Sequence, residues 1–165
     1  MDNSIFTIGD KIPDVILKFM GPDGLSNIKS SDLFQGKRIA VFGAIGAYGP
    51  VCSTVQLPGV ISVADQLLEK GIDGIVCIAV NDPFVMKAWG SHHGTGHKVA
   101  MISDHDGQFT KAIGVAIDLT EPFGFGQRSK RYSMIVNDGA VEKFDVEEDL
   151  LECEVSSAKM MVQSL

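Results

Sequence analysis

Cys52 stands where the chain is predicted to pass from a buried strand into a helix. The apolar run at residues 39–42 is typical of a buried strand, the segment GAYGPVC at residues 46–52 ends it, and helically spaced apolar residues follow. The first turn of a helix carries unpaired backbone N–H groups and the positive end of the helix dipole, which both favour a thiolate over a thiol. Since Pro50 also lies two residues before the sulfur, we interpret Cys52 as a reactive cysteine and not as a small buried apolar side chain.

The elements that must position this cysteine follow from the pattern around it. We expect the helix that starts at about Cys52 to run to Leu68, to bend at Pro58, which lacks an N–H donor, and to stop at Gly71. The prolines and glycines ahead of the first strand predict a loop-rich opening. The continuous apolar run at residues 74–80 is typical of a central strand covered on both faces, so a parallel crossover should join it to the first strand.

Further strands and helices are predicted downstream. An Asn-Asp-Pro cap predicts a helix over residues 84–89, with Phe84 and Trp89 in the core. The remaining expected elements are a strand at 99–103, a short helix at 109–113, a glycine-rich loop at 124–126, a hairpin of 131–136 and 140–146, and a last helix capped near 156–157. This order predicts an α/β fold of the thioredoxin-like type, with a mixed central β-sheet flanked by helices, in a single domain over residues 1–165.

The composition excludes several classes of function. The chain has 14 basic and 21 acidic residues, a net charge of −7 and no long basic cluster, so we do not expect it to bind nucleic acid. No segment has the uninterrupted apolar length of a membrane span, and the N-terminus lacks a basic region followed by an apolar stretch, so we expect a cytoplasmic protein. Three cysteines in a chain of this size predict catalytic or packing thiols and not a disulfide framework.

Four histidines are loosely grouped in the sequence, namely His92, His93, His97 and His105. Neutral histidine is a common ligand of zinc and copper, which raises a metal hypothesis. Gly94 and Gly96 would break any helix that aligned these side chains, so the spacing favours a solvated loop. We therefore expect no metal site, and we expect no bound cofactor.

Several separated segments resemble one protein family. Besides GAYGPVC, these are LPG at 57–59, VNDPFVMKAW at 80–89, RSKRYSM at 128–134 and VSSA at 155–158. Over nearly its whole length the chain is similar to the peroxiredoxins of the type-five branch, called type II in plants. The resemblance implies a thioredoxin-like thiol peroxidase in which Cys52 is the peroxidatic cysteine, Arg131 the active-site arginine and Pro50 the residue that shields the sulfur.

The chemistry of these residue types agrees with that role. A Cys52 thiolate can attack the terminal oxygen of a peroxide, expel water or an alcohol, and become a sulfenic acid. A permanently charged arginine can hold the thiolate ionised, and its fork of donors can bind the peroxide oxygens as charge moves between them. A single arginine in a strand is more often a surface charge, but beside a cysteine at a helix start in this fold we expect Arg131 to lie in the site.

The active-site loop departs from the usual family sequence, Pro-Gly-Ala-Phe-Thr-Pro. Ile45 stands in place of the first proline, Tyr48 in place of the phenylalanine, and Gly49 in place of the threonine, whose hydroxyl bonds the thiolate and the peroxide in the family. The loss of this hydroxyl predicts reduced activity. It also leaves a second interpretation open, in which the protein is a low-activity redox sensor or interaction module that retains the fold and Cys52.

The sulfenic acid must be reduced by a second thiol, and the sequence leaves three routes open. Cys77 resembles the second cysteine of plant type II members, although its apolar strand predicts a core residue. Cys153 lies in an acidic loop, in the region where animal type-five members carry a resolving cysteine. We favour the third route, an external thiol such as glutathione with glutaredoxin, or a thioredoxin. The resemblance also implies a homodimer.

Overall fold

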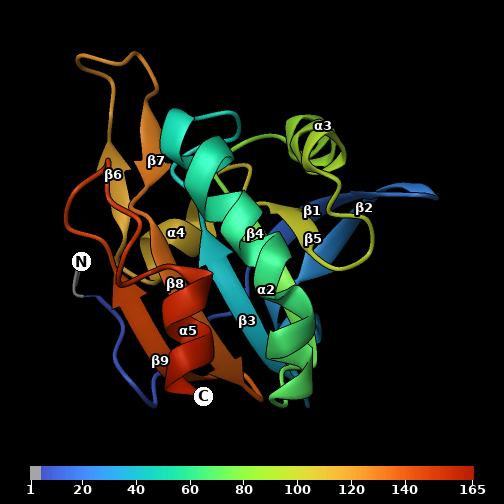
Figure 1. Ribbon diagram of the computed structural model, residues 1–165. Coiled ribbons are helices and arrows are strands. Elements are labelled where there is room, and N and C mark those ends of the chain that lie inside the picture. Colours follow the sequence, from blue (N-terminus) through green and yellow to red (C-terminus); the bar gives the residue numbers. More distant parts are fainter. Residues whose placement is uncertain (1–4) are drawn as a thin grey trace.

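Apolar parallel strands form the centre of the fold. The computed structural model describes residues 5–165 and contains one seven-stranded mixed sheet, with strands in the order β2-β1-β5-β4-β3-β8-β9 (Figure 1). The strands are β1 (Ile16–Gly21), β2 (Gly24–Lys29), β3 (Arg38–Gly43), β4 (Gly74–Ala79), β5 (Ala100–Ser103), β8 (Tyr132–Asn137) and β9 (Ala140–Val146). β3, β4 and β5 are parallel, and β8 pairs antiparallel with β3. The parallel crossover and the mixed sheet predicted from the sequence are therefore confirmed.

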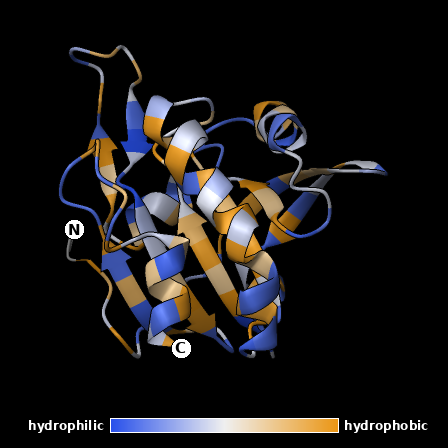
Figure 2. Ribbon diagram, viewed as in Figure 1, coloured by the Kyte–Doolittle hydropathy of each residue, from blue (hydrophilic) through white to orange (hydrophobic). Residues whose placement is uncertain are grey.

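Helices cover both faces of this sheet. They are α1 (Ser30–Phe34), α2 (Leu57–Glu69), α3 (Pro83–His93), α4 (Gln108–Ala112) and α5 (Ala158–Ser164). One apolar core contains Val60 of α2, Trp89 of α3 and Met161 of α5. The core on the other face contains Phe34 of α1 and Phe109 of α4, whose rings stack. Figure 2 shows β3 as an apolar band beneath α2 and α5, which carry polar residues outward.

The turn and cap residues act as the sequence predicts. Asp138 and Gly139 have positive φ angles of 48° and 80° in the turn between β8 and β9, which is the conformation that such hairpin turns require. The Asp82 side chain accepts a hydrogen bond from the Val85 N–H at 2.9 Å at the start of α3. Ser157 caps α5 by accepting from the Met160 N–H at 3.2 Å. These local signals set the ends of the elements around the site.

Two expectations about the secondary structure and the core were wrong. The opening is not loop-rich, because β1 and β2 form a hairpin at one edge of the sheet and α1 follows it. β2 is largely exposed, and its two large apolar residues, Leu25 and Ile28, are three positions apart, so it lacks the apolar alternation by which a strand is predicted. The helix expected at residues 84–89 runs on to His93, and Phe84 is 61% exposed, so it lies outside the core, whereas Trp89 is fully buried as predicted.

A second, smaller sheet stands at the end of the molecule near the predicted active site. It consists of β6 (Ala116–Asp118) and β7 (Gln127–Ser129), which pair antiparallel. The loop between them contains the predicted glycine-rich segment, and the phenylalanines at positions 123 and 125 stack in it with ring centroids 5.3 Å apart. This loop is important because it forms one wall of the cavity described below.

Candidate active site

Cys52 lies in the first turn of a helix, as the sequence predicts. The helix begins at Pro50, and residues 52–56 form a π-helical turn, η1 (Cys52–Gln56), in which the Leu57 N–H donates to the Cys52 carbonyl. α2 continues from this turn, and Pro58 near its start has no N–H to donate. The irregular turn therefore ends two residues before Pro58, the residue at which the sequence predicts a bend. Cys52 is only 2% exposed and belongs to the core between the sheet and the helices.

Arg131 reaches the sulfur directly. Its Nη1 lies 3.3 Å from Cys52 Sγ, its Nε donates to the Glu152 carbonyl at 3.0 Å, and its Nη2 donates to the Leu150 carbonyl at 2.8 Å. The residue precedes β8 instead of lying within it, and it is 1% exposed. A permanently charged guanidinium therefore lies against the sulfur in a place from which water is largely excluded.

Gln56 is a site residue that sequence reasoning missed. Its Nε2 donates to the Gly43 carbonyl at the end of β3 at 2.9 Å, and its Oε1 accepts from Arg131 Nη1 at 3.4 Å. The side chain is buried and satisfied at both ends of the amide. Gln56 therefore connects the end of β3 to the guanidinium. Its position four residues after Cys52, one helical turn further on, was a signal that it would lie near the sulfur.

Glu147 organises the loop that holds Arg131. Its buried carboxylate accepts hydrogen bonds from the Glu154 N–H and the Ser156 N–H, both at 2.9 Å, and from the Ser156 hydroxyl. Its own N–H donates to the Arg131 carbonyl at 2.9 Å. The segment between these contacts supplies the two carbonyls that hold the guanidinium. One carboxylate thus closes the loop of residues 147–156 around the arginine.

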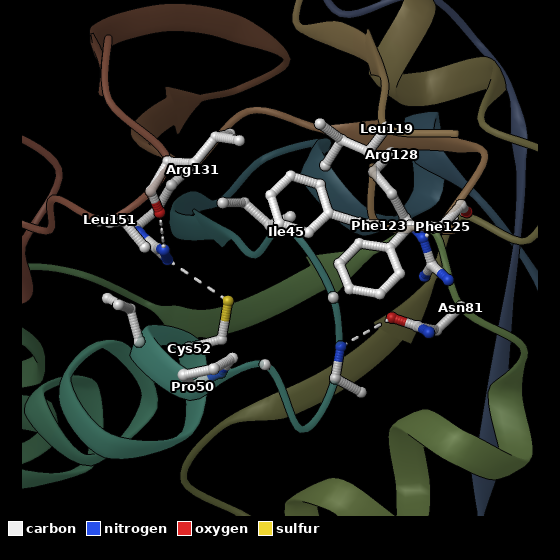
Figure 3. Close-up of a pocket in the computed structure, with 15 residues that line it drawn as sticks. Ile45, Pro50, Cys52, Asn81, Leu119, Phe123, Phe125, Arg128, Arg131 and Leu151 are labelled. Atoms are coloured by element: carbon white, nitrogen blue, oxygen red, sulfur yellow. Dashed lines mark hydrogen bonds between the residues drawn. The ribbon is translucent and has the colours of Figure 1, made fainter. Parts of the chain in front are cut away.

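An apolar cavity of about 270 Å³ opens onto the sulfur. Figure 3 shows Cys52 and Arg131 on one side of it and Asn81 and Arg128 on the other. The cavity is lined by Ile45, Gly46, Ala47, Gly49, Pro50, Val51, Cys52, Asn81, Leu119, Phe123, Phe125, Arg128, Arg131, Leu150 and Leu151. A small organic molecule is the kind of ligand that a space of this size and polarity suits.

Gly49 lies next to the sulfur, which gives physical meaning to the departure noted in the loop. A Cβ built at this position would lie 3.5 Å from Cys52 Sγ and 3.2 Å from the Gly46 carbonyl oxygen. A hydroxyl on that carbon would be within reach of the sulfur. Pro50, the next residue, lines the cavity beside Cys52. Tyr48 ahead of it has a positive φ of 65°, so the loop turns sharply here.

Sequence comparison identifies the family. A model of the Redoxin family matches residues 7–162. Peroxiredoxin-2D from Arabidopsis thaliana is 38% identical over 160 residues, which cover 96% of this chain and 98% of that protein. The chain belongs to the peroxiredoxin family. The chloroplastic peroxiredoxin-2E from Arabidopsis thaliana is 41% identical over 145 residues, and the match covers 86% of this chain and 62% of the longer relative.

Solved peroxiredoxin structures have the same fold. Reduced Prx3 from Vibrio vulnificus in complex with H2O2 superposes with a TM-score of 0.91 at 39% identity, covering 97% of this chain and 99% of that one. Peroxiredoxin 5 from Alvinella pompejana gives a TM-score of 0.83 at 33% identity, covering 96% and 97% of the two chains. The predicted thioredoxin-like fold and the type II resemblance are confirmed. The relatives support a thiol peroxidase, and they do not favour the alternative of a redox sensor or interaction module.

The two other cysteines of this peroxiredoxin occupy different environments. Cys77 is buried in β4, and burial together with the nearby Cys52 raises the pKa of its thiol far above the ordinary value. Cys153 is partly exposed in the loop that holds Arg131. Burial raises the pKa of the Cys153 thiol as well, although the charge of Arg131 opposes this effect. Cys153 is therefore the more accessible of the two.

Ser53 anchors the π-helical turn to α3. Its hydroxyl accepts a hydrogen bond from the indole N–H of Trp89 at 2.9 Å. Its own N–H donates to the Gly49 carbonyl at 2.8 Å. The residue after Cys52 is thereby tied both to the active-site loop and to the core.

The histidine expectation needs one correction. His92 and His93 lie in the last turn of α3 and not in a loop, because the helix ends only where Gly94 adopts a left-handed conformation. Among residues 5–165 no group of three or more His, Cys, Asp or Glu side chains is arranged to hold a metal ion. Within the same part of the chain, none of the helices is both long enough and apolar enough to cross a membrane.

Proposed function

We propose that this peroxiredoxin reduces hydrogen peroxide and organic hydroperoxides at Cys52. The observation that carries the proposal is the 3.3 Å contact between Arg131 Nη1 and Cys52 Sγ inside an apolar cavity. The thiolate attacks the terminal peroxide oxygen, so that an S–O bond forms as the O–O bond breaks. The sulfur loses two electrons and becomes a sulfenic acid, and the leaving oxygen takes a proton and departs as water or an alcohol.

In this proposal Arg131 and Pro50 have separate roles. The guanidinium stays charged throughout and stabilises first the thiolate and then the negative charge that develops on the leaving oxygen. Its Nε and Nη2 are held by carbonyls of the acidic loop, so Nη1 is the group directed at the reacting atoms. Pro50 lines the cavity next to the sulfur and limits its contact with water.

We propose an external thiol as the reductant of the sulfenic acid, either glutathione with glutaredoxin or a thioredoxin. Cys77 is buried in β4 and would need the strand to open before it could react. Cys153 is the better internal candidate because it is partly exposed and follows Glu152, whose carbonyl accepts a hydrogen bond from Arg131 Nε. Intact mass after one equivalent of peroxide distinguishes the routes: an internal disulfide loses two hydrogens, whereas a persistent sulfenic acid retains one oxygen.

A homodimer through the loops around the cavity is also proposed. Four aromatic side chains are exposed on the segments concerned: Tyr48 in the active-site loop, Phe123 and Phe125 in the loop that lines the cavity, and Phe84 in the first turn of α3. Exposed aromatic side chains are enriched at protein interfaces. Sedimentation velocity of the wild type and of Phe84→Glu tests the proposal, and a monomer at all concentrations would contradict it.

A reducing compartment such as the cytosol is proposed as the location, since all three cysteines are free thiols. Cell fractionation tests this location.

Steady-state consumption of peroxide with glutathione and glutaredoxin, or with thioredoxin and its reductase, tests the activity. We expect Cys52→Ser to abolish turnover and Cys77→Ser to retain it. Turnover by Cys52→Ser at the wild-type rate would overturn the assignment of Cys52.

A further inference from the structure

A second arginine lines the cavity, and its charge is not compensated. Arg128 donates from Nε to the Phe125 carbonyl at 3.1 Å and from Nη1 to the Val80 carbonyl at 2.7 Å. Its guanidinium also lies over the Phe125 ring, 5.8 Å from the centroid. Among residues 5–165 no carboxylate forms an ion pair with it, and its Nη2 has no protein acceptor. The group is partly buried, so it keeps a charge and free donors at the cavity wall.

Asn81 adds a second donor at the same place. Its Oδ1 accepts from the Ala47 N–H at 2.9 Å, which fixes the orientation of the amide. In the described part of the chain its Nδ2 has no acceptor, so the two N–H bonds of this amide remain available. A Cβ built on Gly46 would lie 3.6 Å from Arg128 Nη1 and 3.9 Å from Asn81 Oδ1. The guanidinium and the amide therefore flank one corner, which Gly46 leaves open.

An apolar surface separates this corner from the sulfur. Ile45, Leu119, Phe123 and Phe125 line the cavity between the two arginines (Figure 3). The cavity thus has a reactive end at Cys52, an apolar middle and a cationic end at Arg128. The acidic loop contributes Leu150 and Leu151 at the Arg131 side, so its carboxylates are not the groups that face the Arg128 corner.

We propose that Arg128 and Asn81 bind the carboxylate of an organic hydroperoxide whose peroxide group reacts at Cys52. The inference rests on the proposed peroxidase function and assigns it a substrate class, namely hydroperoxides that bear a carboxylate on an apolar body. A guanidinium and an amide give a carboxylate both charge and directed donors. The thiolate takes the terminal OH group, and the O–O bond breaks. The alkoxide that leaves accepts a proton from solvent and departs as the hydroxy acid.

The test compares ω-hydroperoxy carboxylic acids of increasing chain length with their methyl esters. The second-order rate constant for oxidation of Cys52 is measured by rapid quench and intact mass, so no reductant is needed. Because the ester keeps the apolar body and the peroxide but loses the charge, the ratio of the two rate constants isolates the carboxylate. We expect the acid to react about tenfold faster than the ester at the best chain length. A ratio of one or below at every length would overturn the proposal.

Variants test whether Arg128 causes the difference in rate between the acid and the ester. In Arg128→Met the ratio of acid to ester should fall to about one, whereas the matched control Lys111→Met, which removes the same charge from α4, should keep the wild-type ratio. A high ratio that persists in Arg128→Met would overturn the assignment to this residue. Circular dichroism checks that Arg128→Met is folded. The comparison of acid and ester on the wild-type protein does not depend on this variant.

A binding measurement separates this inference from the proposed function. Cys52→Ser removes the reacting sulfur, and calorimetry then measures the affinity for the ω-hydroxy acid product and for its methyl ester. Tighter binding of the acid, lost in the double variant with Arg128→Met, supports the subsite even if the wild type consumes no peroxide. Equal binding of the acid and the ester overturns the subsite, while oxidation of wild-type Cys52 by hydrogen peroxide still supports the peroxidase.

Discussion

Cys52 and Arg131 meet at 3.3 Å, but the two segments that deliver them are held in different ways. The cysteine segment is fixed by the core: Ser53 is bonded to the buried Trp89, and Gln56 is bonded to the end of β3. The arginine is fixed by carbonyls of an acidic loop, which is closed mainly by one carboxylate. The position of the sulfur therefore depends on the packing of helices against the sheet, whereas the orientation of the Arg131 guanidinium depends on a loop.

The largest effect is expected when the charge partner itself is removed. Arg131→Met should lower the rate constant for oxidation of Cys52 by hydrogen peroxide about a hundred- to thousandfold, because the developing negative charge loses its main donor. Stopped-flow measurement of the oxidation step gives this value. Lys130→Met is the matched control, since it removes a neighbouring charge that makes no contact with the sulfur. A loss of less than about threefold in Arg131→Met would contradict the role given to the guanidinium.

A smaller effect on the oxidation of Cys52 is expected when the loop of residues 147–156 loses the carboxylate that closes it. Glu147→Ala leaves three donors without an acceptor, two of them on the buried Ser156, so the free energy of unfolding should fall by about 2–4 kcal/mol and the oxidation rate constant by about tenfold. Urea titration and stopped-flow kinetics measure the two quantities. The exposed neighbour provides a control, because Glu148→Ala should change the stability by less than about 0.5 kcal/mol. If the stability falls while the folded enzyme keeps its full rate, the loop does not position Arg131.

The smallest effect on the oxidation rate is expected from a substitution in the loop that precedes Cys52. Gly49→Thr should raise the rate constant with hydrogen peroxide by up to about tenfold, because a hydroxyl within reach of the sulfur restores a charge-assisted hydrogen bond. Gly49→Val has nearly the same shape without the hydroxyl and makes the same contact with the Gly46 carbonyl. The rates of the two variants are compared directly. A threonine variant no faster than the valine variant would show that the hydroxyl adds nothing here.

The sequence predicted the cysteine side of the site better than the arginine side. A strand, a turn and a helix follow one another locally, so the placement of Cys52 could be derived from neighbouring residues. Arg131 was expected in the site through family resemblance, because its burial depends on carbonyls about twenty residues away. Glu147 gave no signal, since in an acidic run a carboxylate that bonds the backbone looks the same as one in solvent. β2 was missed because its sequence shows no alternation of apolar and polar residues, and its strand character comes from pairing with β1.

The bond between Ser53 and Trp89 has a consequence for measurement. The chain contains one tryptophan, its indole is fully buried, and it donates to the residue that follows the reactive cysteine. Any change that unwinds the first turn after Cys52 breaks this bond and alters the surroundings of the indole. The emission of Trp89 is therefore an intrinsic optical probe of the active-site turn, with no second tryptophan to obscure its signal.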